Sequence, residues 1–236
     1  MPTIPPTLLP RTRRSLLASL AFGAGAILLA RPALASNDQS LVDQAKITVD
    51  NFTNDPQFAD MRRKLANAKG VFVVPQLLKA SFIIGGEGGS GLLLAKTTTG
   101  WSEPAIYTLG AGSIGLQIGG EASQVMLLLM SDNAVDAILR NEFKLGADAT
   151  VAAGPVGAGI EAATTTNLGA DILSYSKSRG LAAGVSVEGA VITARHSRNT
   201  AYYGREAHPR NILYDQAVSS PGTGALRQAL AAAEMR

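Results

Sequence analysis

Closely spaced basic residues are the feature of this sequence best suited to bind a ligand. Three groups stand out: Arg62, Arg63, Lys64 and Lys69; Lys177 and Arg179; and Arg195, Arg198, Arg205 and Arg210. Ammonium and guanidinium groups attract anionic lipid headgroups, and each such contact near a charged membrane is worth about 1 kcal/mol. Solvated helix faces and ordinary loops carry the same residue types, so each group considered alone favours that simpler interpretation.

Acid–base and metal chemistry have few candidate residues here. The chain has no cysteine and two histidines, His196 and His208. This excludes thiolate nucleophiles, disulfides and cysteine-ligated zinc, and it leaves little for a metal site. Neither histidine belongs to a G-x-S-x-G or H-E-x-x-H pattern, and the carboxylates lack the Asp-x-Asp spacing of a calcium loop. We therefore expect no catalytic residue, no metal site and no cofactor.

A glycine-rich segment matches the spacing of dinucleotide-binding loops. The segment is Gly86-Glu87-Gly88-Gly89-Ser90-Gly91. A dinucleotide site needs a helix that begins at this loop, so that the helix N-terminus meets the pyrophosphate. Here the segment leads into Leu92–Lys96, an apolar run typical of a strand. We therefore interpret Gly85–Gly91 as a turn between two strands.

The N-terminal segment has the features of an export signal. Arg11, Arg13 and Arg14 form a basic region ahead of the apolar stretch. A short apolar stretch follows, and Ala33-Leu34-Ala35 matches the small-x-small cleavage pattern. Thr12–Leu17 fits the twin-arginine export motif, although an ordinary secretory signal with two arginines is the alternative. We predict a signal peptide over residues 1–35, cleaved after Ala35, and a periplasmic or secreted bacterial protein.

Removal of this signal changes the charge of the chain. The whole sequence has 21 Lys and Arg against 18 Asp and Glu, and residues 1–35 hold four Arg and no acid. The processed chain therefore has 17 basic and 18 acidic residues, a net charge of −1. Such a balance excludes a uniformly basic nucleic-acid binder, because phosphate contacts need an excess of Lys and Arg.

The remaining sequence predicts one β-rich α+β domain. Helices are expected over residues 37–53, after the helix-start signal Asp55-Pro56, and after Ser131. The expected strands are 71–74, 81–84, 91–96, 105–109, 113–118, 125–130, 147–153, 157–163, 171–176, 181–187 and 190–195. Many short, glycine-bounded strands are typical of an antiparallel barrel or sandwich, here with flanking helices.

An ordered series of short motifs in this chain resembles the SYLF domain family. The motifs are Ala68–Pro75, Lys79–Phe82, Gly85-Gly86, Gly89–Gly91, Trp101–Pro104, Gly115–Gly119, Lys144–Gly146, Ala153–Gly157, Ser174–Gly180, Gly184–Ala190 and Tyr202–Gly204. Each motif is weak, but the ordered set is specific. We therefore divide the chain into the signal peptide, an N-terminal helical arm (36–57), a SYLF-like domain (58–217) and an Ala-rich C-terminal tail (218–236).

The resemblance implies a non-catalytic module that binds acidic phospholipids. From the clustering of basic residues we hypothesise lipid contacts at Lys79, Lys177 and Arg179, which lie inside the motifs, and second at Arg62, Arg63 and Lys64, which would act as an adjacent arm. For an exported bacterial protein the available acidic lipids would be phosphatidylglycerol and cardiolipin, and actin, which some eukaryotic members bind, is not an expected partner. The helical arm carries Asp38, Asp43 and Asp50 against Lys46, so we expect it to pack on the domain rather than enter a bilayer.

Two other function classes stay open at this point. The near-neutral processed chain and its Ala-rich tail also suit an envelope structural or protein-interaction module without lipid specificity. A hydrolase with an unfamiliar site is the third alternative, and it would need a deep polar pocket around a Ser, His or Tyr side chain.

Overall fold

A computed structural model describes residues 31–140, 142–156, 169–178, 181–184 and 187–235. Its helices are α1 (Arg31–Thr53), α2 (Ala59–Leu65), α3 (Asp132–Ile138), α5 (His196–Tyr203), α6 (Pro209–Leu213) and α7 (Gly224–Glu234), with short 3-10 turns at Pro56–Phe58 and Pro221–Thr223. Residues 1–30 of the predicted signal peptide (1–35), the strand expected at 157–163, and Arg179 lie outside the described residues. The expected cleavage site after Ala35 falls in the first turns of α1.

Two long strands organise the sheet. They are β1 (Gly70–Thr97) and β3 (Ala105–Leu129), which pair antiparallel from Gly70 opposite Leu129 to Leu93 opposite Ala105. The turn expected at Gly85–Gly91 is therefore absent, because these residues form the middle of β1. Glycine weakens a strand but does not end it when a partner strand supplies the hydrogen bonds. The chain reverses instead at Thr97–Gly100, where Gly100 has a φ of 111° that disfavours other residues.

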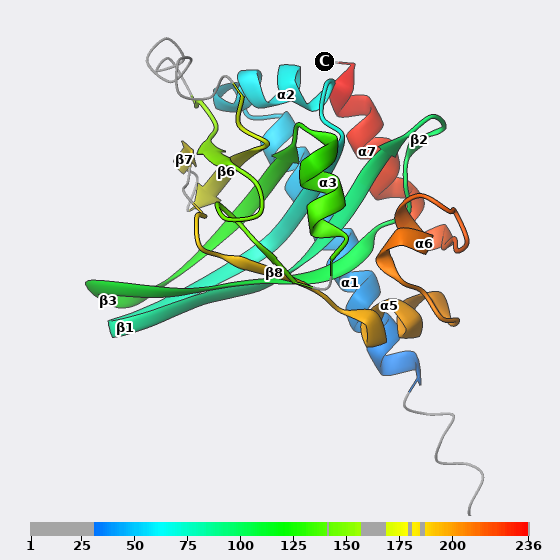
Figure 1. The fold of residues 1–236 in the computed structure, drawn as a ribbon, viewed down its shortest axis with the longest axis horizontal. Helices are drawn as coiled ribbons and strands as arrows, with labels where there is room; N and C mark the ends of the chain where they lie inside the picture. Colours follow the sequence, from blue (N-terminus) through cyan, green and yellow to red (C-terminus); the bar gives the residue numbers. More distant parts are fainter. Residues whose placement is uncertain (1–30, 141, 157–168, 179–180, 185–186, 236) are drawn as a thin grey trace, which may run out of the picture.

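The β1–β3 ribbon is doubled over, so that the two halves of β1 lie side by side. The backbone N–H of Lys96 donates to the carbonyl of Lys69 over 2.8 Å. A Cβ atom at Gly89 would lie 2.4 Å from the carbonyl oxygen of Gln76, and one at Gly91 would lie 2.5 Å from the Phe72 ring. Glycine is thus required where the halves meet. The middle of the ribbon projects from the body of the molecule (Figure 1).

The other strands extend this ribbon on both sides into one curled, eight-stranded half-barrel. They are β2 (Gly100–Trp101), β4 (Glu142–Lys144), β5 (Val151–Ala153), β6 (Ile172–Ser178), β7 (Leu181–Gly184) and β8 (Val191–Ala194). The C-terminal half of β3 pairs with β6, and its N-terminal half pairs with β8. The α+β, β-rich prediction is confirmed, with one correction: β5 and β6 are parallel, so the sheet is mixed rather than wholly antiparallel.

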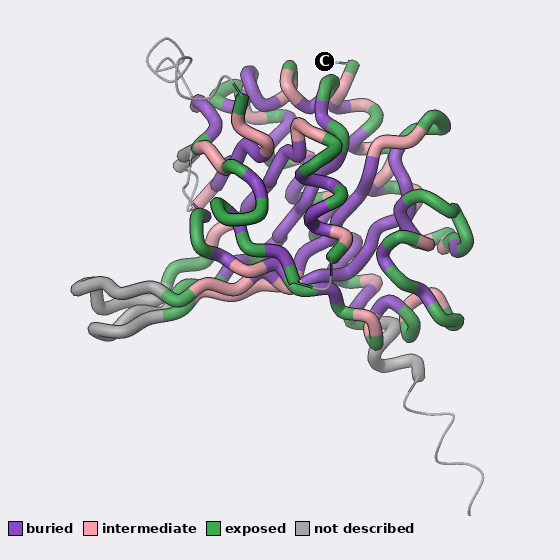
Figure 2. The backbone as a smooth tube through the Cα atoms, in the orientation of Figure 1, coloured by how far each residue is buried: buried purple, intermediate pink, exposed green. Residues whose placement is uncertain are grey.

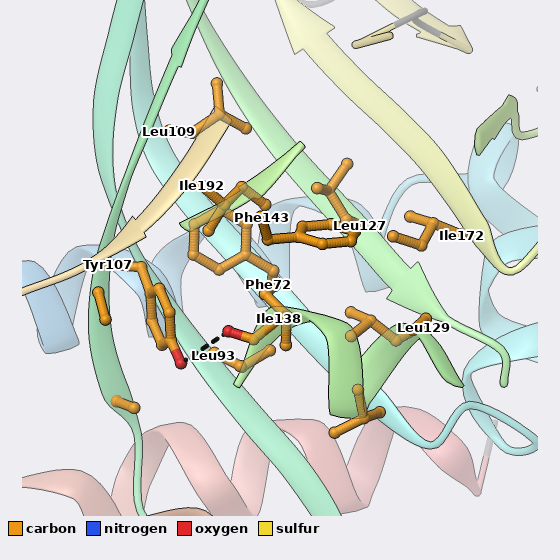
Figure 3. Packing of buried hydrophobic residues seen from close by; sticks show 14 of the residues in the cluster. Phe72, Leu93, Tyr107, Leu109, Leu127, Leu129, Ile138, Phe143, Ile172 and Ile192 are labelled. Atoms are coloured by element: carbon orange, nitrogen blue, oxygen red, sulfur yellow. Dashed lines mark hydrogen bonds between the residues drawn. The ribbon is translucent and has the colours of Figure 1, made fainter. Parts of the chain in front are cut away.

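The two faces of the sheet bury separate apolar clusters, because successive strand side chains point to opposite faces. On one face, called here the α3 face, Phe72, Tyr107, Leu127 and Phe143 pack with α3 and α6 (Figure 3). The Tyr107 hydroxyl donates to the carbonyl of Ile138 over 3.2 Å, and burial raises the pKa of this phenol. Figure 2 shows this interior as an almost continuous buried region.

Helices α1, α2 and α7 cover the opposite face, called here the α1 face. The apolar stripe of α1 is buried against Val71, Val73 and Met126 of the sheet; its members are Leu41, Val42, Ala45, Val49 and Phe52. Leu226 and Leu230 of α7 enter the same cluster, so part of the predicted tail packs in the fold. The α1 arm therefore docks on the domain, as expected from its acidic polar face. None of the described helices is both long and apolar enough to span a membrane.

Candidate lipid-binding site

A polar groove of about 490 Å³ opens between α1 and the sheet. It is lined by Gln44, Asn51, Pro75, Gln76, Ala122, Ser123, Gln124 and Lys177. The register of β1 is irregular between Val74 and Leu77, and Pro75 and Gln76 of this segment line the groove. Such an extra residue bends a strand and leaves part of its backbone unpaired. Asn51 donates to the Gln124 side chain over 3.1 Å, and Gln124 donates to the Thr48 hydroxyl over 3.2 Å. These side-chain hydrogen bonds hold α1 and β3 together at the wall of the groove.

Lys177 lines this groove, and its charge is already compensated by Asp55. Its Nζ atom donates to Oδ2 of Asp55 over 2.8 Å and to the carbonyl of Asn51 over 3.2 Å. The hydrogen bond from Lys177, followed by one from the backbone N–H of Gln57, holds the pKa of Asp55 below its usual value. Lys177 is the titratable side chain of the lining, so the groove offers hydrogen bonds rather than acid–base chemistry.

Arg62 binds the same segment at the end of α1 that Lys177 contacts. Its guanidinium donates to the carbonyl oxygens of Thr53, over 3.1 Å, and Asp55, over 2.9 Å. These oxygens lie at and beyond the end of α1, where backbone carbonyls lack helical partners, and a basic side chain there satisfies them. The structure thus brings two predicted lipid contacts, Arg62 and Lys177, together at residues 51–55. Both stabilise the junction of α1, α2 and β6.

The other predicted contacts on α2, Arg63 and Lys64, are not engaged with the end of α1 in the part of the chain that the structure describes. Arg63 forms an ion pair with Asp60 over 3.2 Å, but 64% of its side chain remains exposed. Lys64 is half-buried, and its side chain has no hydrogen bond or ion pair within the part of the chain that the structure describes. These two cations can therefore face a charged surface without breaking the α1 junction.

Lys79 is on the β1–β3 ribbon, where the ribbon leaves the body. It is exposed, and Glu121 is its partner across the ladder. Lys79 makes no ion pair among the described residues, and Glu121 instead accepts a hydrogen bond from Ser178 over 2.5 Å. The neighbouring Leu78 is 54% exposed, one of the few large apolar side chains so open to solvent in the described chain. Figure 2 shows the ribbon change from buried to exposed toward this end.

Leu78 faces the same side of the sheet as the groove. Leu77 belongs to the apolar cluster of the α3 face, so alternation directs Leu78 to the α1 face and Lys79 back to the α3 face. Sequence reasoning missed both Leu78 and the groove. A signal was present: Gln44 and Asn51 are seven residues apart, a spacing that places two amides on one side of a helix.

The third basic group is divided by the fold. Arg198 donates to the buried carboxylate of Asp38 through Nε over 2.9 Å, and to the Ser90 hydroxyl over 2.8 Å. This ion pair joins α5 to α1 and β1. Arg195, Arg205 and Arg210 are exposed. Arg198 is therefore used by the fold, as Arg62 and Lys177 are.

The residues of the motif Trp101–Pro104 also stabilise the fold. The Ser102 hydroxyl accepts from the backbone N–H of Ala95 over 3.0 Å. Glu103, 7% exposed, accepts from the Thr223 hydroxyl over 2.6 Å and pairs with Arg227 over 3.0 Å. The motif thereby fastens α7 to the sheet.

Comparison with known families agrees with this arrangement of motifs. A model of the Ysc84 family, described as Las17-binding protein actin regulator, matches residues 110–233, from the first part of β3 to α7. The chain belongs to this family, the Ysc84/SYLF family. The predicted resemblance is confirmed.

Several curated relatives share this domain. The SH3 domain-containing protein PJ696.02 of Schizosaccharomyces pombe is 38% identical over 161 residues, which are 66% of this chain and 37% of the relative. The SH3 domain-containing YSC84-like protein 1 of Rattus norvegicus is 36% identical over 64% of this chain and 44% of its own length. Protein YSC84 of Saccharomyces cerevisiae is 35% identical over 70% and 36%. The chain thus spans less than half the length of these SYLF relatives.

Proposed function

We propose that this SYLF protein is an exported bacterial module that binds membrane surfaces rich in phosphatidylglycerol or cardiolipin without catalysing a reaction. The observation that carries the proposal is the exposure of the consecutive residues Leu78 and Lys79, on opposite faces of the β1–β3 ribbon where it leaves the body. A projecting ribbon with an apolar side chain on one face and a cation on the other suits edge-on contact at the boundary between acyl chains and charged headgroups. The export signal predicted over residues 1–35 would direct the protein to the periplasm or the medium, where actin is not a partner.

The proposed contact is weak and reversible. Burial of the exposed part of Leu78 contributes about 1 kcal/mol, and each cation near an anionic surface contributes about 1 kcal/mol. Lys79 supplies the cation of the ribbon, whereas Lys177 and Arg62 remain engaged with Asp55 and the end of α1. Arg63 and Lys64 lie on α2, away from the projecting ribbon (Figure 1). Because most of the attraction comes from exposed charges, binding falls as salt rises.

Vesicle co-sedimentation tests this proposal. The chain beginning at Ser36 is used, since the basic, apolar segment 1–35 would itself bind anionic vesicles. We expect pelleting with phosphatidylglycerol or cardiolipin vesicles, little with phosphatidylcholine, and less at moderate than at low salt. Pelleting that is equal on all three lipids, or absent from all, would contradict the proposal; absence would favour a protein partner in the envelope.

Charge reversal locates the contact. Lys79→Glu removes one attraction and adds one repulsion, about 2 kcal/mol, so we expect roughly 30-fold weaker binding. Lys144→Glu is the matched control, because Lys144 is an exposed lysine on another strand, β4. Equal losses in the two variants would show a dependence on net charge alone and remove Lys79 from the site.

A further inference from the structure

The two histidines of the chain, His196 and His208, lie against each other at the surface although they are twelve positions apart in the sequence. His196 begins α5, and His208 immediately precedes α6. Their Nδ1 atoms are 3.3 Å apart, and the rings are 5.3 Å apart between centroids at 64°. His196 is half-buried, and 54% of the His208 side chain is exposed. These are the two histidines of the sequence, and the fold brings them together from positions 196 and 208.

Glu206 fixes the orientation of His208. Its carboxylate Oε1 lies 3.0 Å from Nε2 of His208. A carboxylate accepts a hydrogen bond, so Nε2 carries the proton in the neutral ring, and Nδ1 presents a lone pair toward His196. A histidine that donates its second ring nitrogen to a carboxylate is the usual arrangement of a metal ligand, because the carboxylate fixes the tautomer and increases ligand basicity.

Both rings are attached to rigid parts of the fold. The backbone N–H of Arg195 donates to the carbonyl of Ile106, and the buried side chain of Asn199 accepts from the backbone N–H of Ile106 over 2.7 Å. These contacts hold the start of α5 against β3. On the other side, Ala207 and Pro209 are both buried and flank His208. The imidazoles therefore meet in a geometry that does not depend on a long loop.

We propose that His196 and His208 bind one divalent transition-metal ion of the zinc class through their Nδ1 atoms. With metal–nitrogen bonds of about 2.0–2.1 Å, two nitrogens 3.3 Å apart subtend roughly 104–111° at the metal, the angle of a tetrahedral site. The metal takes the place of the proton shared between the two Nδ1 atoms, and His196 changes to the tautomer with its proton on Nε2. Water completes the coordination.

The site has two protein ligands and open access. The described residues contain no cluster of three or more His, Cys, Asp or Glu side chains arranged to hold a metal ion. Glu206 is turned to the far nitrogen of His208, where it orients the ring rather than ligating the ion. Two ligands supply about half the donors of a structural zinc site, so we expect a dissociation constant in the micromolar range. The site is separate from the proposed lipid surface.

Calorimetric titration of the full chain with zinc chloride, prepared without a polyhistidine tag, tests the proposal. One zinc ion per chain is expected. His208→Ala and His196→Ala should each weaken binding at least tenfold, and Glu206→Gln should weaken it about tenfold by releasing the ring of His208. Glu142→Gln, an exposed carboxylate on β4, is the matched control and should bind zinc as the unmodified chain does.

Circular dichroism of each variant shows whether the fold is retained, which is expected because His208 and Glu206 are largely exposed. Failure of the unmodified chain to bind zinc at millimolar concentration would overturn the proposal. Stoichiometric binding that survives in folded His208→Ala would also overturn it, since the ion would then lie elsewhere. Unchanged affinity in Glu206→Gln would overturn the orienting role of that carboxylate.

Discussion

The junction of α1, α2 and β6 and the projecting part of the β1–β3 ribbon use basic residues in opposite ways. At the junction, Arg62 and Lys177 donate to carbonyl and carboxylate oxygens of residues 51–55. On the ribbon, Lys79 is exposed beside an exposed Leu78. Lys79 and Lys177 both belong to family motifs, so membership of a motif does not distinguish a residue that holds the fold from one that faces a partner. Pairing and exposure do.

The largest expected effect breaks the ribbon where its halves meet. In Gly91→Ala, the added methyl group would lie 2.5 Å from the Phe72 ring and 2.9 Å from the carbonyl oxygen of Val73. Both neighbours are buried, so we expect a loss of about 2–3 kcal/mol in the free energy of unfolding, measured by chemical denaturation. Gly112→Ala is the control on the same ribbon, because nothing lies within 4 Å of its added Cβ. A similar loss in both would mean that strand flexibility, not close packing, requires glycine.

The junction gives the next largest effect. Lys177→Met leaves the Asp55 carboxylate, 14% exposed, without its cation, so we expect a loss of about 2 kcal/mol in stability. Lys144→Met removes an exposed lysine from β4 and should change stability by less than about 0.5 kcal/mol. Denaturant midpoints of the two variants provide the comparison. If Lys177→Met is as stable as the control, Lys177 is available to a ligand and the contrast between the two regions fails.

The dependence of stability on acidic pH tests the role of the carboxylate contacts, including that of Asp55 at the junction. The pKa of Asp55 is lowered by Lys177, and that of Asp171 by hydrogen bonds from Ser131 and Thr150. A depressed pKa in the folded state gives stability that is complete above the unfolded value, near 3.9, and is lost as pH falls below it. Unfolding followed from pH 6 to pH 2 should show this loss. Asp55→Asn should show a smaller loss than the unmodified chain, and an identical pH profile would contradict the assignment.

The smallest expected effect is on the ribbon. Leu78→Asn should leave the free energy of unfolding nearly unchanged, because the side chain is already half exposed, but should weaken binding to phosphatidylglycerol vesicles about fivefold. Tyr214→Asn removes a large exposed side chain distant in sequence and is the control. Vesicle binding by Leu78→Asn that equals the control would mean that the ribbon touches the headgroups only through charge.

Local signals in the sequence predicted where helices begin. Which basic residues stabilise the fold depends on contacts between residues far apart in the sequence. Asp55 caps the first 3-10 turn by accepting from Gln57, and Ser131 caps α3 by accepting from Ala134, both as expected. Capping involves neighbours in the chain. The pairing of Lys177 with Asp55 joins residues 122 positions apart, so no spacing rule reveals it.

The glycine-rich segment was misread for the same reason. A run such as Gly85–Gly91 has the local composition of a turn. Its extended backbone is fixed by β3 across the ladder and by the other half of β1 against it. The groove, which depends on a strand irregularity facing a helix, likewise has no signature within one segment. The family motifs were specific as an ordered set, not singly. Several of their residues, such as Gly89 and Gly91, lie where backbone segments distant in sequence are in contact.

The doubled ribbon also sets an order of events in folding. Leu93 and Ala105 are twelve residues apart and pair next to the reversal at Thr97–Gly100, whereas Gly70 and Leu129, at the far end of the same ladder, are 59 residues apart. The entropy lost on closing a loop rises with its length, so pairing is expected to advance outward from the reversal. We therefore expect the strand halves on which α1 packs to join last, and substitutions near Gly100 to change the folding rate more than the free energy of unfolding.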